Sequence, residues 1–270
     1  MAEAIDSGSE QKELIRLQRR QANKNRTIAV AVHIAALLIW EFGVRWFEVP
    51  KFILPSPSEV IQTITAAKYD WFNNSLVTAS EILGGYLLAI ILGIVTALLF
   101  SWSKMFSTLA FPLLITLNMI PKVALGPLVI VWFSYGISTN ILITFSLCYF
   151  PILLTTIRGL REIEPDLLDL VNSLRGTKWQ QFIYIQLPGA MPFIFSGMKV
   201  ATILAVAGAV VGEFIASDRG LAYLMIQVQA SLDTPAMFMA VTLITLIGML
   251  LYLAVLFLEH MVVPQDARKS

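Results

Sequence analysis

The chain is a series of long apolar runs separated by shorter polar segments. A helix needs about 20 apolar residues to cross a bilayer, and six runs come close to or exceed that length. They lie at 28–46, 78–101, 108–133, 139–158, 193–216 and 236–258. The pattern predicts an all-α, polytopic membrane protein with six transmembrane helices and with both termini on the same side.

Two of these spans depend on local turn and proline signals. Residues 123–157 contain no charge, and we divide the third span from the fourth at FSYGISTN, because Gly136 and Asn140 favour a turn there. Three prolines fall inside the third span: Pro112, Pro121 and Pro127. Proline removes a helix hydrogen bond and clashes with the preceding turn, so we expect this span to be kinked.

The composition agrees with a bilayer as the solvent. Of 270 residues, 57% are hydrophobic and only 14% are charged, whereas soluble domains carry about 25% charged residues. The net charge of +1 gives no reason to expect a nucleic-acid partner. A single cysteine, Cys148, excludes a disulfide within the chain, and two histidines with one cysteine make a metal site improbable.

Basic residues are shared unequally between the two sides of the predicted membrane domain. One side holds thirteen, in the residues before 28, the 102–107 loop, the segment after the fourth span and the tail; the other side holds four. Loops rich in lysine and arginine stay in the cytoplasm. We therefore expect a cytoplasmic head at 1–27, a transmembrane domain at 28–258 and a cytoplasmic tail at 259–270, with the N- and C-termini cytoplasmic.

One cytoplasmic segment, PDLLDLVNSLRGTKWQQFIYIQLP at residues 165–188, has the pattern of two short helices. Pro165 suits the first turn of the first helix, and Gly176 is expected to end it in a left-handed conformation. Thr177 and Gln180 form the capping-box pattern of a second helix, which Pro188 is expected to end. An apolar stripe at helical spacing follows one face of the first helix: Leu167, Leu170, Val171 and Leu174.

The segment therefore predicts a helix-turn-helix on the cytoplasmic membrane face, held by its apolar stripe against the chain's own helix ends. From the pattern alone, two interpretations stay open. The segment is either an interfacial linker between two spans or a docking surface for a cytoplasmic partner. The residues outside the stripe that would form such a surface are Asp169, Asn172, Ser173, Gly176 and Thr177.

Ionisable side chains at membrane depth are the second candidate site. A lysine there costs about 2.5–3.5 kcal/mol on insertion scales, so it faces a cavity or a partner. Lys122 lies midway along the third span, and Glu81 and Glu213 lie toward the outer ends of the second and fifth spans. Either Lys122 and Glu213 form a structural ion pair, or both line a substrate path. Lys199, near the cytoplasmic end of the fifth span, is expected to snorkel.

The 165–188 segment resembles the EAA loop of permease subunits of ATP-binding cassette (ABC) importers. That loop reads Glu-Ala-Ala, three residues, Gly, nine residues and then Ile-x-Leu-Pro. Counting back from Ile185-Gln186-Leu187-Pro188 places Asp169-Leu170-Val171 at the Glu-Ala-Ala and Arg175 at the glycine. The spacing fits, whereas Asp replaces Glu, two bulky residues replace the alanines, and the glycine comes one position later as Gly176.

Further stretches are similar, in order, to the same family: LPSPSEV, SEILGGYLLAIILGI, FPLLITLNMIPKVALGPLVIVWFSYGIS and AGAVVGEFIASDRGLAYL. The likeness covers residues 50–260 and extends to permeases for sulfonates, taurine, nitrate and vitamin precursors. Within that group, the stretch GEFIASDRGLAYL…LDTP looks closest to importers of thiamine-pyrimidine precursors or riboflavin. A sulfonate, taurine or nitrate importer permease is the alternative.

The resemblance implies a type I ABC importer permease in the bacterial plasma membrane, which forms the path for a small polar solute. It also implies a second copy of this permease, two copies of an ATPase subunit that bind ATP and Mg²⁺, and an extracytoplasmic solute-binding protein. The ATPase would dock on a coupling loop at 162–190.

The sequence itself has no GxxxxGK[ST] phosphate loop, so we expect neither enzymatic activity nor a cofactor in this chain. It also lacks a nucleophile–base set and an HExxH motif, which an intramembrane enzyme would need. A secondary transporter, with inverted repeats and ion-binding carboxylates, is the alternative from a different class.

Overall fold

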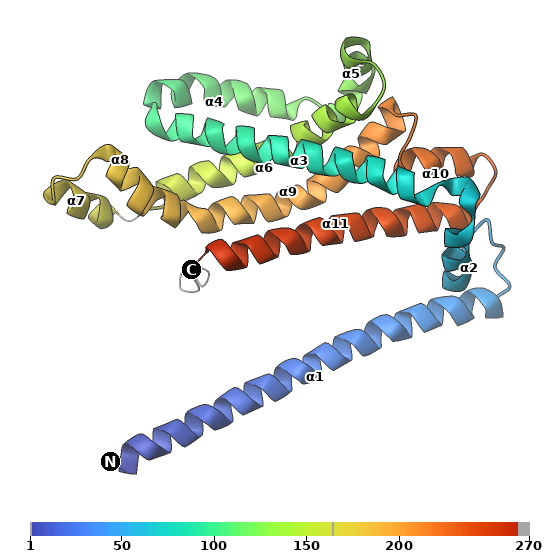
Figure 1. Cartoon of the computed structure of the whole chain (residues 1–270), viewed down its shortest axis with the longest axis horizontal. Helices are drawn as coiled ribbons and strands as arrows, with labels where there is room; N and C mark the ends of the chain where they lie inside the picture. The colour runs from blue at the N-terminus through green and yellow to red at the C-terminus, as the bar shows by residue number, and fades with distance from the viewer. Residues whose placement is uncertain (1, 164, 264–270) are drawn as a thin grey trace. The chain divides into compact units, whose positions relative to one another are not determined.

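The computed structural model describes residues 2–163 and 165–263, and every regular element in that part of the chain is helical (Figure 1). The all-α prediction is therefore confirmed. Most of the predicted tail, residues 264–270, lies outside the described residues. The chain divides after Thr65 into two compact units, and each unit has its own internal contacts.

The first unit begins with one continuous helix, α1 (Ala2–Trp46), which contains both the predicted head and the predicted first span. It is followed by α2 (Pro57–Gln62) and a 3-10 turn at Thr63–Thr65. Because α1 is helical throughout, no backbone feature marks the expected boundary at residue 27.

Charged side chains fix the short helix α2. Glu59 accepts a hydrogen bond from the N–H of Ser56 at 3.0 Å, and its carboxylate lies 2.7 Å from the Lys51 ammonium. The Lys51 and Ser56 hydrogen bonds hold the pKa of Glu59 below its ordinary value. Glu41 of α1 accepts from Ser58 at 2.9 and 3.0 Å, so the loop between the two helices is tied at both ends.

Three long helices form the centre of the second unit: α3 (Trp71–Trp102), α6 (Ile137–Arg161) and α9 (Leu187–Ala216). Figure 1 shows them lying alongside one another. Ile82, Cys148 and Ala205, one from each helix, are fully buried in the shared core. Close approach needs small residues, as is usual between membrane helices: a Cβ at Gly208 would lie 2.7 Å from the Thr144 Cα in α6.

A fourth long helix, α11 (Thr234–Val262), packs along α9, and α10 (Leu221–Gln229) lies in the connection between them (Figure 1). Asp233 caps the start of α11. Lys199 of α9, which was predicted to snorkel, forms an ion pair with Glu259 of α11 at 2.9 Å. A carboxylate within reach on the next helix neutralises the ammonium where it stands.

The third predicted span is broken. It consists of α4 (Lys104–Met119), a 3-10 turn at Lys122–Leu125, and α5 (Gly126–Phe133). Ile120 is extended, with φ −64° and ψ 126°, because a residue that precedes proline is pushed out of the helical region. Pro121 therefore interrupts the helix completely, where the sequence predicted a kink.

Five helical stretches in the described part are long and apolar enough to cross a membrane: Thr27–Trp46, Ala67–Trp102, Ile137–Arg161, Lys178–Ala216 and Thr234–Val262. The first of these contains the predicted first span. The second includes a 3-10 turn at Ala67–Tyr69 before α3. The one predicted span without a match among these five is the third, which corresponds to the broken α4–α5 pair and is therefore absent from a count based on continuous helices.

Candidate functional site

The 165–188 segment contains the two predicted short helices, α7 (Pro165–Ser173) and α8 (Lys178–Gln181). The capping box that starts α8 is confirmed. The Thr177 N–H donates to Gln180 Oε1 at 2.7 Å, and the Gln180 N–H donates to Thr177 Oγ1 at 3.3 Å. Two backbone groups at the helix start are thereby satisfied.

Gln181, which the sequence reasoning did not single out, ties the two helices together. Its Nε2 donates to the Leu168 carbonyl at 3.2 Å and to Asn172 Oδ1 at 2.8 Å. Asn172, predicted to face a partner, is therefore bound within the segment. Glutamine at the fourth position of a capped helix carries no sequence signal for this contact.

The prediction that Gly176 takes the left-handed conformation is wrong. Arg175 does so, with φ 55°. The Gly176 N–H donates to the Val171 carbonyl at 2.8 Å and the Arg175 N–H to the Asn172 carbonyl at 3.0 Å. This pair of bonds is the Schellman pattern. In that pattern the left-handed residue directly precedes the one whose N–H reaches back five residues, and here these two residues are Arg175 and Gly176. Arg175 is also the position that matches the glycine of the EAA loop.

Gly176 is instead required by space. A Cβ at this position would meet the Val171 Cγ1 and would lie 3.0 Å from the Val171 carbonyl oxygen. The end of α7 therefore closes tightly over its own last turn. A side chain at residue 176 would open that contact, whereas a glycine at residue 175 would relieve backbone strain.

Three of the four residues in the apolar stripe of α7 are exposed, which contradicts the prediction that the stripe packs against the chain's own helix ends, and the fourth, Val171, is half-buried. Leu167 is 42% exposed, Leu170 55% and Leu174 75%. Asp169 and Ser173 are exposed as well. The segment is held through α8, so α7 does not need to bury its stripe. Exposed apolar residues grouped with polar ones are typical of an interaction surface.

Three aromatic rings attach the segment to the end of α3. The ring centroid of Trp102 lies 5.4 Å from that of Phe182 and 6.3 Å from that of Trp179. Phe182 is 6% exposed, so this contact is a buried one. Rings at these separations attract one another beyond simple area burial. The α7–α8 segment is therefore in direct contact with α3.

The segment continues without a break into α9. A π-helical turn at Phe182–Gln186 follows α8, and α9 begins at Leu187. The prediction that Pro188 ends the second helix is wrong, because Pro188 lies in the first turn of α9, directly after the π-helical turn. Proline has no N–H to donate back into that turn. The segment and α9 thus form one continuous helical stretch, Lys178–Ala216.

At the other end of α9, Glu213 holds the start of α10. Its carboxylate accepts from the N–H of Ala222 at 2.7 Å and of Tyr223 at 3.0 Å, and from Thr78 Oγ1 at 2.5 Å. It is 1% exposed. A carboxylate placed on the first N–H groups of a helix satisfies donors that have no partner inside it. Glu213 therefore joins α3, α9 and α10.

Thr78 and one further α3 side chain, Asn74, complete this contact. Thr78 Oγ1 accepts from the Leu221 N–H at 2.9 Å, and Asn74 Oδ1 accepts from the Gly220 N–H at 2.9 Å. Sequence reasoning missed both residues, although they lie four positions apart on one face of α3. Glu81, one turn further along, is fully buried and accepts from Asn140 Nδ2 of α6 at 2.7 Å.

Lys122 and Glu213 do not form an ion pair within the described residues. Lys122 bonds to Asn118 at the end of α4, donating to its Oδ1 at 2.7 Å and also to its carbonyl. Of the two predicted roles, the structural pair is not formed. The ammonium is instead held at the break between α4 and α5.

A cavity of about 320 Å³ lies beside Lys122, between the end of α4 and α6. Three aromatic side chains of α6 share its wall: Phe145, Tyr149 and Phe150. This size is at the lower end of small-molecule sites. The cavity therefore offers a small ligand flat apolar surfaces and one ammonium group.

A family model described as "binding-protein-dependent transport system inner membrane component" matches residues 89–265 of the chain. This range includes the broken third span, the α7–α8 segment and Glu213. The match is therefore centred on the parts of the structure that contain both candidate sites.

Three curated proteins are similar along most of their length. A probable ABC transporter permease of Haemophilus influenzae is 35% identical, over 83% of this chain and 91% of that protein. The formylaminopyrimidine transport permease ThiX of Halalkalibacterium halodurans is 32% identical, over 84% and 91%. The riboflavin transport system permease RibX of Chloroflexus aurantiacus is 33% identical, over 86% and 87%.

Proposed function

Since the chain belongs to the family of binding-protein-dependent inner membrane components, the permease subunits of type I ABC importers, we propose that it imports a small planar heterocycle of the pyrimidine-precursor or flavin kind. Two similar permeases are named for formylaminopyrimidine and for riboflavin. The observation that carries the proposal is the cavity beside Lys122, which combines aromatic walls with one cationic donor.

The chemistry of the cavity fits such a solute. Phe145, Tyr149 and Phe150 present ring faces on which a flat heterocycle can stack. The Lys122 ammonium can donate to a ring nitrogen or carbonyl oxygen, and the Asn118 side chain already orients it. Because the cavity lies where the third span is broken, movement of α4 against α6 would open or close it. Glu213, with all its partners inside the fold, is assigned a structural role.

The assembly that this function requires contains other chains. We propose a homodimer of this permease, two copies of an ATPase subunit that bind ATP and Mg²⁺, and an extracytoplasmic solute-binding protein. The excess of basic residues supports a cytoplasmic location for both termini and for the α7–α8 segment. This chain then contributes the path and the coupling contact, and the ATPase contributes the chemistry.

The docking surface for the ATPase is proposed to be the exposed side of α7. It comprises Leu167, Leu170, Leu174, Asp169 and Ser173. Gly176 and Thr177 shape the turn beside it, and Asn172 stabilises it from within. A rigid contact is needed to pass movement on, and the Gln181 bonds together with the aromatic contact at Trp102 supply that rigidity.

The test is uptake of labelled formylaminopyrimidine and of riboflavin by proteoliposomes that contain the permease, its ATPase and its solute-binding protein. Lys122→Met should lower uptake about tenfold, because a charge-assisted hydrogen bond to the solute is lost. Assembly, measured by size-exclusion chromatography, should be unchanged. Lys24→Met, which changes an exposed lysine of α1, is the matched control and should transport normally.

Three results would contradict the proposal, in whole or in part. Normal uptake by Lys122→Met would remove the lysine from the path. A loss of assembly in the same variant would make the lysine structural. Uptake of taurine or an alkanesulfonate in place of both heterocycles would reject the substrate class while leaving the permease function intact.

A further inference from the structure

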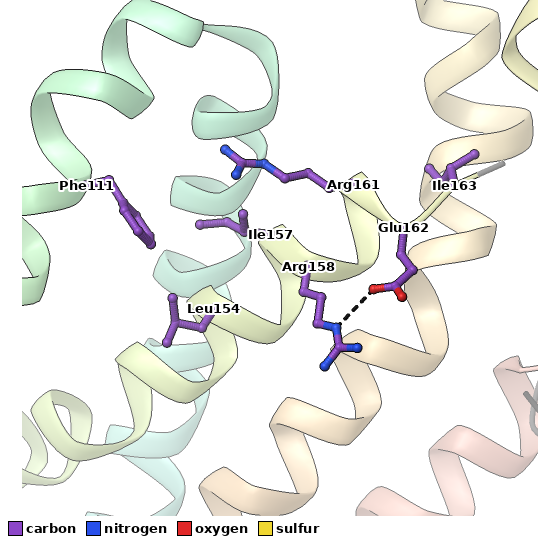
Figure 2. Close-up of a pocket in the computed structure, with 7 residues that line it drawn as sticks. All are labelled: Phe111, Leu154, Ile157, Arg158, Arg161, Glu162 and Ile163. Atoms are coloured by element: carbon purple, nitrogen blue, oxygen red, sulfur yellow. Dashed lines mark hydrogen bonds and ion pairs between the residues drawn. The ribbon is translucent and has the colours of Figure 1, made fainter. Parts of the chain in front are cut away.

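A cleft opens at the end of α6 that precedes α7, and it is separate from the cavity beside Lys122. It has a volume of about 780 Å³. Phe111 of α4 and Leu154 and Ile157 of α6 form apolar walls, and the charged residues that line the cleft are Arg158, Arg161 and Glu162 (Figure 2). The cleft therefore combines an apolar slot with a cationic edge.

Arg161 also borders a second, smaller cavity of about 320 Å³, between the end of α3 and the start of α4. Hydroxyl groups of Ser101, Ser107 and Thr108 line it. The Arg161 Nη2 donates to Ser107 Oγ at 3.3 Å. One guanidinium thus stands between a hydroxyl-lined inlet and an apolar slot.

The two arginines at this end of α6 differ in their partners. Arg158 forms an ion pair with Glu162 at 3.0 Å, and Figure 2 shows its side chain pointing away from that of Arg161. Arg161 has no acidic partner among the residues that the structure describes. Its positive charge is therefore available to an anion, whereas that of Arg158 is neutralised.

We propose that Arg161 and the neighbouring hydroxyls bind the phosphate of an anionic phospholipid, with an acyl chain in the slot beside Ile157. A guanidinium binds phosphate through strong, directed hydrogen bonds, and serine and threonine hydroxyls add neutral donors. Basic pockets between membrane helices on the cytoplasmic side are suited to anionic headgroups. The apolar slot distinguishes a lipid from a soluble phosphate, which has no use for it.

Such a lipid would act on coupling. Arg161 is the last residue of α6, and α7 begins four residues later. A bound headgroup would bridge the ends of α3, α4 and α6 at the base of the proposed docking surface. The inference rests on the proposed function only for this consequence and for the choice of leaflet. Binding itself is measured without ATPase or transport, so the two can fail separately.

The experiment is native mass spectrometry of the full-length chain, purified in a neutral detergent and titrated with phosphatidylglycerol or phosphatidylcholine of identical acyl chains. The wild type should retain phosphatidylglycerol in preference. Arg161→Gln should weaken that binding roughly fivefold, the worth of one basic residue at an anionic lipid surface. Arg158→Gln removes an arginine that is also exposed but whose charge is already paired, so it is the matched control and should bind normally. Ser107→Ala should cause a smaller loss.

A parallel titration with inorganic phosphate identifies the source of the anion. Phosphate binding that depends on Arg161, without preference between the two lipids, would support the anion site but overturn the lipid assignment. Equal retention of both lipids with no phosphate binding would overturn the site itself. Equal losses in the Arg161 and Arg158 variants would also overturn it, because general surface charge would then explain the binding.

Discussion

Glu213 binds three donors with one buried carboxylate, so its removal has a definite cost. Glu213→Ala would leave Thr78 Oγ1 and the N–H groups of Ala222 and Tyr223 without their acceptor. Each buried donor left unpaired costs about 1–3 kcal/mol. We expect a clearly lowered melting temperature for the purified permease, together with loss of helical protection at α10 in hydrogen exchange.

Glu81→Gln is the matched control, because it changes a second buried glutamate on the same side of the bundle. Asn140 donates to Oε1 of Glu81, and the Glu81 carboxyl also lies against that of Glu213. An amide keeps the acceptor oxygen for Asn140 and cannot ionise in the membrane interior. The melting temperature should stay the same or rise. Equal destabilisation by both changes would show that Glu213 is not special as a helix anchor.

At the scale of the element, the α7–α8 turn depends on two neighbouring residues: Arg175 has a positive φ, and Gly176 has no space for a side chain. Gly176→Val should weaken the stimulation of ATPase activity by loaded solute-binding protein, since the new side chain clashes with Val171 and overpacking costs about 1–3 kcal/mol. Arg175→Gly should retain full stimulation, because glycine accepts the positive φ without strain. ATPase activity of the reconstituted complex, with and without the binding protein, is the measurement.

Asp169→Arg separates the turn from the docking surface. It reverses an exposed charge on α7 without touching the contacts of Gly176 or Gln181. Stimulation should fall, while cytoplasmic protease accessibility of the segment stays at the wild-type level. Wild-type stimulation in both Asp169→Arg and Gly176→Val would reduce the segment to a linker.

Element by element, the signals that sequence carries are local ones. Thr177 with Gln180, and the prolines of the third span, act on adjacent backbone, so their effects could be foreseen in kind. The Schellman closure at Arg175 depends on which carbonyl the Gly176 N–H reaches. The helix could end one residue later with the same sequence pattern, so the pattern does not determine which residue is left-handed. Likewise the exposure of the α7 stripe depends on how α8 packs against Trp102, which is distant in sequence.

For the whole molecule, the proposed topology places Asp218 and Ser173 on opposite faces of the membrane. Both are exposed. Asp218→Cys should react with a membrane-impermeant maleimide in intact cells, whereas Ser173→Cys should react only after the membrane is opened. Wild type is the control, because its one cysteine, Cys148, is fully buried. Reaction of both variants in intact cells would overturn the arrangement of spans.

Hydropathy predicted the fold at this scale because five helical stretches are long and apolar enough to cross a membrane. It did not capture how the candidate sites are built. Asn74, Thr78 and Glu213 meet from α3 and α9, more than 130 positions apart, through bonds to backbone N–H groups that every sequence contains. Lys122 and Glu213 looked like partners because both are charged, whereas each is satisfied by a nearer neutral group.

The π-helical turn at Phe182–Gln186 sets an angle for the whole molecule. Such a turn contains an additional residue, and each residue of an α-helix advances the direction of the chain by about 100° around the axis. That additional residue therefore changes by about 100° the direction in which α8 leaves α9, relative to Glu213, which lies about 39 Å further along α9. If α8 rotates, the π turn determines the direction in which the movement is passed along α9 to the start of α10. One additional residue in the helix therefore changes the relative orientation of its two ends.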